Sequence, residues 1–144
     1  MIVLDTSFLI DFFKGKKETL NVLGVSDIDT FDIDLDFDSD AVTTVITYNE
    51  IMSGIKHKKS KKEERFFRRF FSEITILDFD VKSAEKSSDI MVSLLKIGRV
   101  VNALDVLIAG IAMANGAEKI ASADKGFDDI SLVTELEILK SQSQ

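Results

Sequence analysis

Four acidic residues stand at positions where an α/β protein could use them for chemistry. Asp5 follows an apolar run at the start of the chain, and Asp124 follows the strand-like sequence KIASA. Glu50 and Asp105 fall in the expected first turns of two helices. Because ligands of open α/β sheets gather at the carboxyl ends of the strands, we expect all four carboxylates to face the same edge of the sheet.

Each of these acids also has a purely structural explanation. Thr47 and Glu50 have the spacing of a helix capping box, and Asp105 suits the first turn of a helix, where the helix dipole favours an acid. Asp5 could cap the helix that follows it, and Asp124 belongs to an ordinary turn sequence. Considered one at a time, the four acids are therefore explained without catalysis.

Considered together, the four carboxylates favour a bound divalent cation. Clustered acids without cationic partners repel one another unless a positive charge lies between them. Mg²⁺ takes oxygen ligands, and such an ion can activate water for phosphodiester hydrolysis. The sequence has no cysteine and a single histidine, His57, which excludes thiol chemistry, cysteine zinc sites and cages of several histidines. Acid–base chemistry must therefore use carboxylates, lysines, Tyr48 or metal-bound water.

Strands and helices alternate along the sequence, which indicates βαβ units. The expected strands cover residues 2–4, 41–46, 74–79, 119–123 and 131–133. The expected helices cover residues 7–14, 48–56, 63–73, 81–97 and 103–115. We therefore expect a three-layer α/β/α fold with a mostly parallel central sheet, and a single domain over residues 1–144.

Size and composition are those of an ordinary globular domain. The 144 residues are 45% hydrophobic and 30% charged, unlike a disordered chain. The start of the chain lacks the basic region and apolar segment of a signal peptide. The longest apolar stretch, Val106–Ala114, is too short to cross a membrane. A cytoplasmic protein without membrane contact is the simplest interpretation.

Charges are concentrated in two segments of this acidic chain, whose net charge is −7. Residues 27–40 alternate acidic and apolar side chains, as in an edge strand or hairpin arm with one solvated face. A calcium site there is disfavoured because the spacing of an EF-hand is missing. Residues 56–69 hold eight of the eighteen basic residues and two acids, and could be solvated, bind RNA phosphates or dock an acidic partner. The candidate contact residues are Lys58, Lys59, Lys61, Lys62, Arg65, Arg68 and Arg69.

Four phenylalanines share one face of the helix expected after this basic segment, namely Phe66, Phe67, Phe70 and Phe71. Such a helix face normally packs in a core or an interface, whereas exposed rings would be platforms for base stacking. We favour a core or partner contact. We also expect residues 56–62 to form a basic loop that leads into this helix.

Four short motifs resemble the signature of the PIN-domain nucleases. Asp5-Thr6-Ser7 is similar to the opening of that family, and Thr47 to Ile51 with Gly54 looks like its T-x-x-E-h…G element. Asp105 to Ala112 resembles its D-x-x-I-A-x-x-A helix, and Ser122 to Phe127 resembles its final T-x-D-x-D-F turn. The order and spacing agree over essentially the whole chain. A chain of this size without an appended domain most resembles the VapC-type toxins of toxin–antitoxin pairs.

The resemblance implies a metal-dependent endoribonuclease that uses Mg²⁺ or Mn²⁺ and leaves 5′-phosphate and 3′-hydroxyl ends. Asp5 and Asp105 would be the principal metal ligands. Glu50 would bind the metal directly or through water, or orient the attacking water, and Asp124 would complete the acidic pocket. The hydroxyls that would hydrogen-bond around these acids are those of Thr6, Ser7 and Ser122. By the same resemblance we expect an RNA substrate, a homodimer and a VapB-like antitoxin that occludes the site.

Three features depart from the family pattern, and other functions stay open. Ser122 replaces the commoner threonine and preserves the hydroxyl. Gly126 stands where many relatives carry another aspartate, which predicts a weak or absent second metal site. The interval between Asp5 and Glu50 is long because it contains the acidic segment. The alternatives are a housekeeping nuclease of RNA processing and a catalytically degenerate scaffold that only binds partners. A receiver-like phospho-switch and a haloacid-type phosphatase are disfavoured because Asp5 has no second acid beside it.

Overall fold

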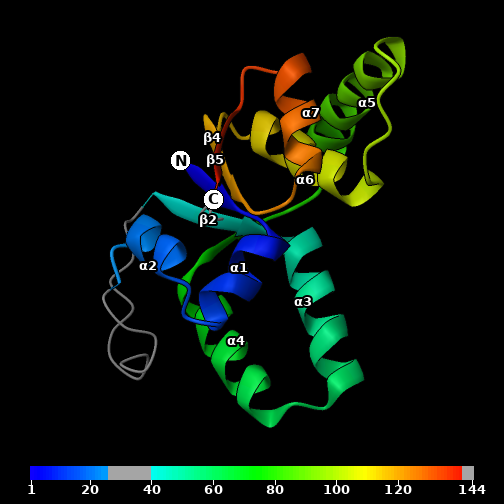
Figure 1. Ribbon diagram of the computed structural model, residues 1–144. Helices are drawn as coiled ribbons and strands as arrows, with labels where there is room; N and C mark the ends of the chain where they lie inside the picture. Colours follow the sequence, from blue (N-terminus) through cyan, green and yellow to red (C-terminus); the bar gives the residue numbers. More distant parts are fainter. Residues whose placement is uncertain (26–39, 141–144) are drawn as a thin grey trace.

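A five-stranded sheet forms the centre of the computed structural model, which describes residues 1–25 and 40–140 (Figure 1). Its strands are β1 (Ile2–Leu4), β2 (Ala41–Thr44), β3 (Thr75–Leu77), β4 (Lys119–Ser122) and β5 (Glu137–Lys140). They lie in the order β3-β2-β1-β4-β5, and all neighbouring strands are parallel. The first strand of the chain is therefore the central strand of the sheet.

Helices cover both faces of this sheet (Figure 1). The described helices are α1 (Thr6–Phe13), α2 (Lys17–Leu23), α3 (Val45–Lys58), α4 (Lys61–Glu73), α5 (Val81–Lys96), α6 (Ala103–Ala114) and α7 (Gly126–Val133). Leu4 of β1 packs in the buried cluster of α1 to α4, whereas Val3 packs in the cluster of α5 to α7. Successive side chains of a strand point to opposite faces, so β1 separates two cores. The expected three-layer α/β/α arrangement is confirmed, with a sheet that is parallel throughout.

Side-chain caps fix where most of these helices begin. Five helices are each capped by the residue before them, namely Asp5 (α1), Thr44 (α3), Ser60 (α4), Asp80 (α5) and Asn102 (α6). In each case the side-chain oxygen accepts a hydrogen bond from a backbone amide of the first turn. Asp5 directly follows β1, and Thr44 is the last residue of β2, so α1 and α3 both start at the carboxyl edge of the sheet.

Some element boundaries differ from the expectation. Residues 131–133, expected as a strand, form the end of α7, and the last strand is β5 instead. Phe127 and Ile130 are fully buried nearly one turn apart, which holds this segment as a helix against the core. The strand expected over residues 41–46 ends at Thr44, and α2 has no counterpart among the expected helices.

Helix α4 packs its four phenylalanines into the core. Their exposed fractions are 8% or less, and the ring of Phe12 in α1 lies 5.9 Å from the rings of both Phe66 and Phe70. Phe13 of α1 makes an edge contact with Phe66 at 5.0 Å. The interpretation of this face as core is therefore confirmed, and these rings are not platforms for base stacking.

The connection between α3 and α4 carries much of the positive charge. Residues 56–58 are helical in α3 and residues 61–62 are helical in α4, so the basic loop expected over residues 56–62 is wrong. Only Lys59 and Ser60 join the two helices, and Lys59 adopts a left-handed conformation with φ of 57°. We call residues 56–62 the basic tip, which lies at the end of α3 that is remote from the sheet (Figure 1).

The acidic segment over residues 27–40 lies outside the described residues except for Asp40, and residues 141–144 also lie outside them. The carbonyl oxygen of Asp40 accepts a hydrogen bond from the amide of Ile2 at 2.8 Å, beside the start of β2. Within the described ranges, no helix combines the length and apolar character needed to cross a membrane.

Candidate active site

Asp5 lies at the carboxyl end of β1 in a set of short hydrogen bonds. Its carboxylate accepts from the amide of Phe8 at 2.8 Å, from Ser7 Oγ at 2.9 Å and from Ser122 Oγ at 2.5 Å. The side chain is only 2% exposed. Burial raises the pKa of Asp5 to about 6, although these hydrogen bonds favour the charged form. Asp5 thus caps α1 and also presents a buried carboxylate in a fixed orientation.

Two serines join the ends of the neighbouring strands β1 and β4. Ser7 Oγ and Ser122 Oγ lie 3.2 Å apart. Ser7 Oγ accepts from the amide of Ala123 at 3.0 Å, and Ser122 Oγ accepts from the amide of Asp124 at 2.8 Å. Because a hydroxyl can donate and accept at once, each serine connects Asp5 to the turn after β4.

Glu50 is held by the first residue of α1. Thr6 Oγ1 donates to Glu50 Oε1 at 2.6 Å and also lies 3.3 Å from Thr47 Oγ1. The capping box expected for Thr47 and Glu50 is wrong, because Thr44 caps α3 by accepting from the amide of Thr47 at 3.2 Å. The helix therefore starts earlier than expected, and Glu50 pairs with α1 rather than with the start of its own helix.

Asp105 contributes a buried acid from the first turn of α6. Asn102 caps this helix by accepting from the amide of Leu104 at 2.9 Å, which confirms the expected helix start. The Asp105 side chain is 8% exposed, and among the described residues its buried Oδ2 atom has no hydrogen-bond partner. Buried polar atoms are normally paired, so an unpaired carboxylate oxygen points to a ligand or ion at this position.

The charges of the other three acids act on Asp105. The pKa of Asp105 is raised to about 7, mostly by burial, then by the negative charge of Asp124 and by a side-chain hydrogen bond with Asp124. The charges of Asp5 and Glu50 contribute in the same direction. The four acids that the sequence singles out are therefore electrostatic neighbours in the folded chain.

Asp124 lies in the turn between β4 and α7. Its Oδ1 atom accepts from the amide of Gly126 at 2.8 Å, which is the turn geometry that the sequence predicts. A Cβ atom placed on Gly126 would lie 2.9 Å from Asp105 Oδ2 and 3.3 Å from Asp124 Oδ1. The start of α7 thus packs directly against two of the four acids.

The chemistry of these side chains fits a hard divalent cation. Only carboxylate and hydroxyl oxygens are present, and these are the atoms that Mg²⁺ and Mn²⁺ prefer. In residues 1–25 and 40–140, no three acidic or histidine side chains already have the spacing of a closed metal cage. The arrangement suits an ion that is held by one or two carboxylates and keeps several water molecules. The unpaired Oδ2 of Asp105 is the atom most in need of such an ion.

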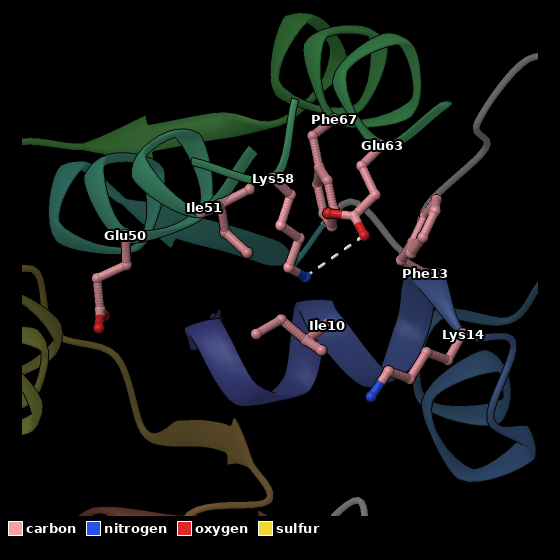
Figure 2. A pocket seen from close by; sticks show the side chains of 9 residues that line it. Ile10, Phe13, Lys14, Glu50, Ile51, Lys58, Glu63 and Phe67 are labelled. Atoms are coloured by element: carbon pink, nitrogen blue, oxygen red, sulfur yellow. Dashed lines mark ion pairs between the residues drawn. The ribbon is translucent and has the colours of Figure 1, made fainter. Parts of the chain in front are cut away.

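A pocket that the sequence did not reveal lies beside Glu50, between α1, α3 and α4 (Figure 2). We call it the Glu50 pocket. Lys58 and Glu63 form an ion pair of 3.5 Å within it. Ile10 of α1 is 40% exposed and lines this pocket, and no pattern in the sequence indicates that exposure. The other residues that line it include Phe13, Lys14, Ile51 and Phe67.

The seven basic residues proposed to contact RNA or a partner are not gathered around the four acids. Lys58 lines the Glu50 pocket, and the remaining six are exposed on the basic tip and along α4. Arg68 pairs with Glu64 at 3.0 Å, and Lys61 lies 3.9 Å from the same acid. Part of this positive charge is therefore neutralised on the surface.

Comparisons with known proteins identify the family of this chain. The family model described as PIN domain matches residues 2–132. A comparison with curated proteins found no significant match. Among solved structures, a chain from DNA-bound VapBC of Salmonella typhimurium matches with a TM-score of 0.72 at 24% identity, over 98% of both chains. A chain from VapBC-5 of Mycobacterium tuberculosis matches with a TM-score of 0.70 at 20% identity, over 96% of both chains.

A third structure, FitAcB from Neisseria gonorrhoeae, contains a chain that matches with a TM-score of 0.70 at 18% identity, over 98% of both chains. At these identities the solved structures establish a shared fold. The family model goes further, because it spans nearly the whole chain and includes all four acids of the site. The protein belongs to the PIN domain family.

Proposed function

We propose that this protein is a metal-dependent endoribonuclease that hydrolyses RNA phosphodiester bonds with metal-activated water, and that it is the toxin of a VapBC-type toxin–antitoxin pair. The observation that carries the proposal is the buried, unpaired Oδ2 atom of Asp105 beside three further acids. This arrangement is costly for the protein alone and becomes favourable with Mg²⁺ or Mn²⁺. The PIN domain match and the VapBC structures of the same fold support the proposal.

The role that we propose for each side chain follows from its contacts in the structure. When bound, the ion would act as a Lewis acid and lower the pKa of a water molecule that it holds. Asp5 and Asp105 are the proposed principal ligands, and Asp124 completes the acidic pocket. Ser7 and Ser122 keep the carboxylate of Asp5 in one orientation through their hydrogen bonds.

Glu50 has the surroundings of a proton acceptor. It is half-buried, and Thr6 donates to its Oε1 atom at 2.6 Å, which fixes the orientation of the carboxylate. We propose that this carboxylate orients the attacking water and accepts its proton. Thr6 would then act through Glu50 by fixing its position.

The basic tip and α4 are the proposed contacts for RNA. Lys59, Lys62, Arg65 and Arg69 are exposed there, as a phosphate-binding surface requires. Their place away from the four acids indicates that they bind the substrate at a distance from the bond that is cut.

A VapB-like antitoxin is the proposed occupant of the Glu50 pocket. Ile10 and Phe13 provide an apolar wall, Lys14 and Lys58 provide positive charge, and Glu50 stands at one side (Figure 2). A peptide with apolar side chains, an acid for the lysines and a basic group for Glu50 would match this lining. Such a peptide would cover Glu50 and thereby occlude the site.

A homodimer is supported by apolar side chains on the surface of α5 and of the segment that follows it. Near the end of α5, Val92 is 49% exposed and Leu95 is 65% exposed, and Val100 in the following segment is 94% exposed. Exposed apolar side chains that gather on one region mark interaction surfaces. We propose that a second copy of the chain covers them.

Cleavage of end-labelled transfer and messenger RNA tests the proposed activity. The wild type and Asp5→Asn are purified side by side and assayed with Mn²⁺ or Mg²⁺, and with a chelator. Asp80→Asn is the matched control, because Asp80 caps α5 as Asp5 caps α1, and asparagine also caps helices. We expect metal-dependent cutting by the wild type and by Asp80→Asn, and none by Asp5→Asn.

Three results would contradict parts of the proposal. Equal cutting by the wild type and Asp5→Asn would indicate a contaminating ribonuclease and no role for Asp5. Cutting that survives the chelator would contradict metal dependence. The absence of both cutting and Mn²⁺ binding in the wild type would identify a catalytically degenerate scaffold.

A further inference from the structure

Lys140 is the last residue of β5, at the carboxyl edge of the sheet. The strand register pairs it with Ser122, the last residue of β4, whose hydroxyl donates to the carboxylate of Asp5. Neighbouring strands lie about 4.8 Å apart, so the backbone of Lys140 is one strand away from this serine. The side chain of Lys140 therefore starts beside the candidate active site.

The ammonium group of Lys140 lies against the turn that carries Asp124. Its Nζ atom donates to the backbone carbonyl oxygen of Asp124 at 3.2 Å and forms an ion pair with Asp128 Oδ1 at 2.9 Å. Asp128 belongs to the first turn of α7, so this lysine connects β5 both to the turn and to the helix that follows it. These two contacts hold a positive charge next to one of the four acids.

This lysine can still bind a ligand. Its side chain is 36% exposed and that of Asp128 is 58% exposed. Of the three donors of an ammonium group, the contacts within the described residues use two. An exposed ion pair contributes little to folding, so an incoming anion can also displace Asp128 with little loss of stability.

A positive charge at this edge answers an electrostatic requirement of the proposed function. Four carboxylates repel the phosphates of RNA as they repel one another. The basic tip begins about 16 Å along α3 from the edge of the sheet, since the helix starts at Val45 and rises about 1.5 Å per residue. Exposed charges farther apart than about 8 Å are largely screened at physiological salt. The tip therefore offsets little of the repulsion beside Asp5 and Asp124, whereas Lys140 is close enough to do so.

We propose that Lys140 binds a phosphate of the RNA beside the four acids, while Asp128 and the carbonyl oxygen of Asp124 hold its ammonium group in place. The inference rests on the proposed ribonuclease function. It adds a contact close to the acids to the more distant contacts of the basic tip. A phosphate suits this position because a lysine binds phosphate oxygens as a point charge.

RNA binding by Lys140→Gln and Lys119→Gln tests the proposal. Lys119 is the matched control because it is the first residue of β4, about 10 Å along the strand from Ser122 and at the opposite edge of the sheet. The anisotropy of a short fluorescein-labelled single-stranded RNA is measured at several salt concentrations with a chelator, which prevents metal-dependent cutting. We expect Lys140→Gln to bind RNA about threefold more weakly. Its slope of log affinity against log salt should be smaller by about 0.7, the value for one phosphate of a single strand, whereas Lys119→Gln should keep the wild-type slope.

Three further measurements separate phosphate binding from a structural role in the turn. Mn²⁺ affinity, read from the electron paramagnetic resonance signal of free Mn²⁺, should not fall in Lys140→Gln, because the lost charge repels the cation. Lys140→Arg keeps the charge and should keep the wild-type salt slope. Asp128→Asn should bind RNA more tightly than the wild type, because it removes an acid that competes with the phosphate.

An unchanged salt slope in Lys140→Gln would overturn the inference. Weaker RNA binding by Asp128→Asn, or a loss of Mn²⁺ affinity in Lys140→Gln, would also overturn it, because either result would show that Lys140 only maintains the turn. The proposed activity is judged separately by cutting. A wild type that binds RNA but cuts none would contradict the nuclease and leave the result for Lys140 standing, whereas a wild type that binds no RNA would overturn both.

Discussion

Hydroxyl groups decide how the individual acids of the site are held. Asp5 is the more buried of the two carboxyls whose pKa is raised, yet its pKa rises only to about 6, against about 7 for Asp105. The difference follows from hydrogen bonds, because Ser7 and Ser122 donate to Asp5 and favour its charged form. Asp105 Oδ2 has no such donor among the described residues and also meets the charge of Asp124.

The raised pKa of Asp105 predicts a stability that depends on pH when metal is absent. The folded protein keeps a proton up to about pH 7 that the unfolded chain releases near the ordinary value of 3.8, so the free energy of unfolding falls as pH rises between these values. Asp105→Asn removes the part of this dependence that Asp105 causes and leaves the part due to Asp5, whose pKa is also raised. Above about pH 7 we expect the metal-free variant to be more stable than the wild type by on the order of 1–3 kcal/mol.

Urea unfolding with a chelator, repeated from about pH 5 to about pH 8, measures this effect. Added Mn²⁺ should reverse the order of stability, since only the wild type keeps the ligand. A variant that is less stable than the wild type across the whole range without metal would show that Asp105 is not strained by its neighbours.

At the residue scale, the sequence predicts the identity of the acids better than their partners. Asp5 and Asp124 could be located because each directly follows an apolar strand, and strand ends converge in a parallel sheet. The cap of α3 could not be located, because Thr44 and Thr47 both stand in a β-branched run. Which threonine caps depends on where β2 stops, and this is set by pairing with β1 and β3 rather than by the run itself.

At the scale of the elements, the close packing of α6 against α5 depends on one small residue. Gly110 brings α6 so close to α5 that an added Cβ atom would lie 2.7 Å from Ser83 O and 2.9 Å from Ser87 Cβ. Overpacking a buried contact usually costs about 1–3 kcal/mol, and more where backbone blocks relaxation. We expect Gly110→Ala to lower the free energy of unfolding by at least that amount, measured by urea denaturation.

Gly54→Ala in α3 is the control for this prediction, because its Cβ atom would meet nothing within 4 Å. Alanine favours a helix over glycine by up to about 1 kcal/mol, so this variant should be as stable as the wild type or slightly more so. Equal stability of Gly110→Ala and Gly54→Ala would mean that the two helices can separate at little cost.

The element-scale errors have physical causes. The segment over residues 131–133 is short and mostly apolar, so its sequence fits a strand as well as a helix. Only the burial of Phe127 and Ile130 against the core shows that it continues a helix. The sequence does not predict α2, because Lys16 before it makes no side-chain cap and the helix is only seven residues long. The longer helices α4, α5 and α6 were located nearly correctly because each has a capping residue and a clear apolar face.

For the whole molecule, the distribution of charge predicts how RNA binding depends on salt. Replacing the four lysines of the basic tip that were named as candidate contacts should weaken RNA affinity and flatten its salt dependence, since fewer phosphates are neutralised. Mn²⁺ affinity should not change, because these side chains do not contact the four acids. The variant carries Lys58→Ala, Lys59→Ala, Lys61→Ala and Lys62→Ala, and is tested by RNA binding with the metal replaced by Ca²⁺ or omitted.

A control for this prediction removes the same charge elsewhere. It replaces four lysines outside the basic tip, namely Lys17, Lys82, Lys86 and Lys96, with alanine. Both variants lose few stabilising contacts, because ion pairs of exposed lysines such as Lys61 with Glu64 contribute little to folding. If the two variants lose RNA affinity equally, only net charge matters and the basic tip is not a binding surface.

The central place of β1 in the sheet has a consequence for synthesis on the ribosome. The strand is made before the other described strands, but one of its two partners, β4, is made only after β2 and β3. The bond from Ser122 to Asp5 spans 117 residues, and contacts of such long range form late. A nascent chain that stops before β4 carries Asp5, Glu50 and Asp105 without the strand that aligns them. The site is therefore complete only after β4 and the turn that carries Asp124 have been made.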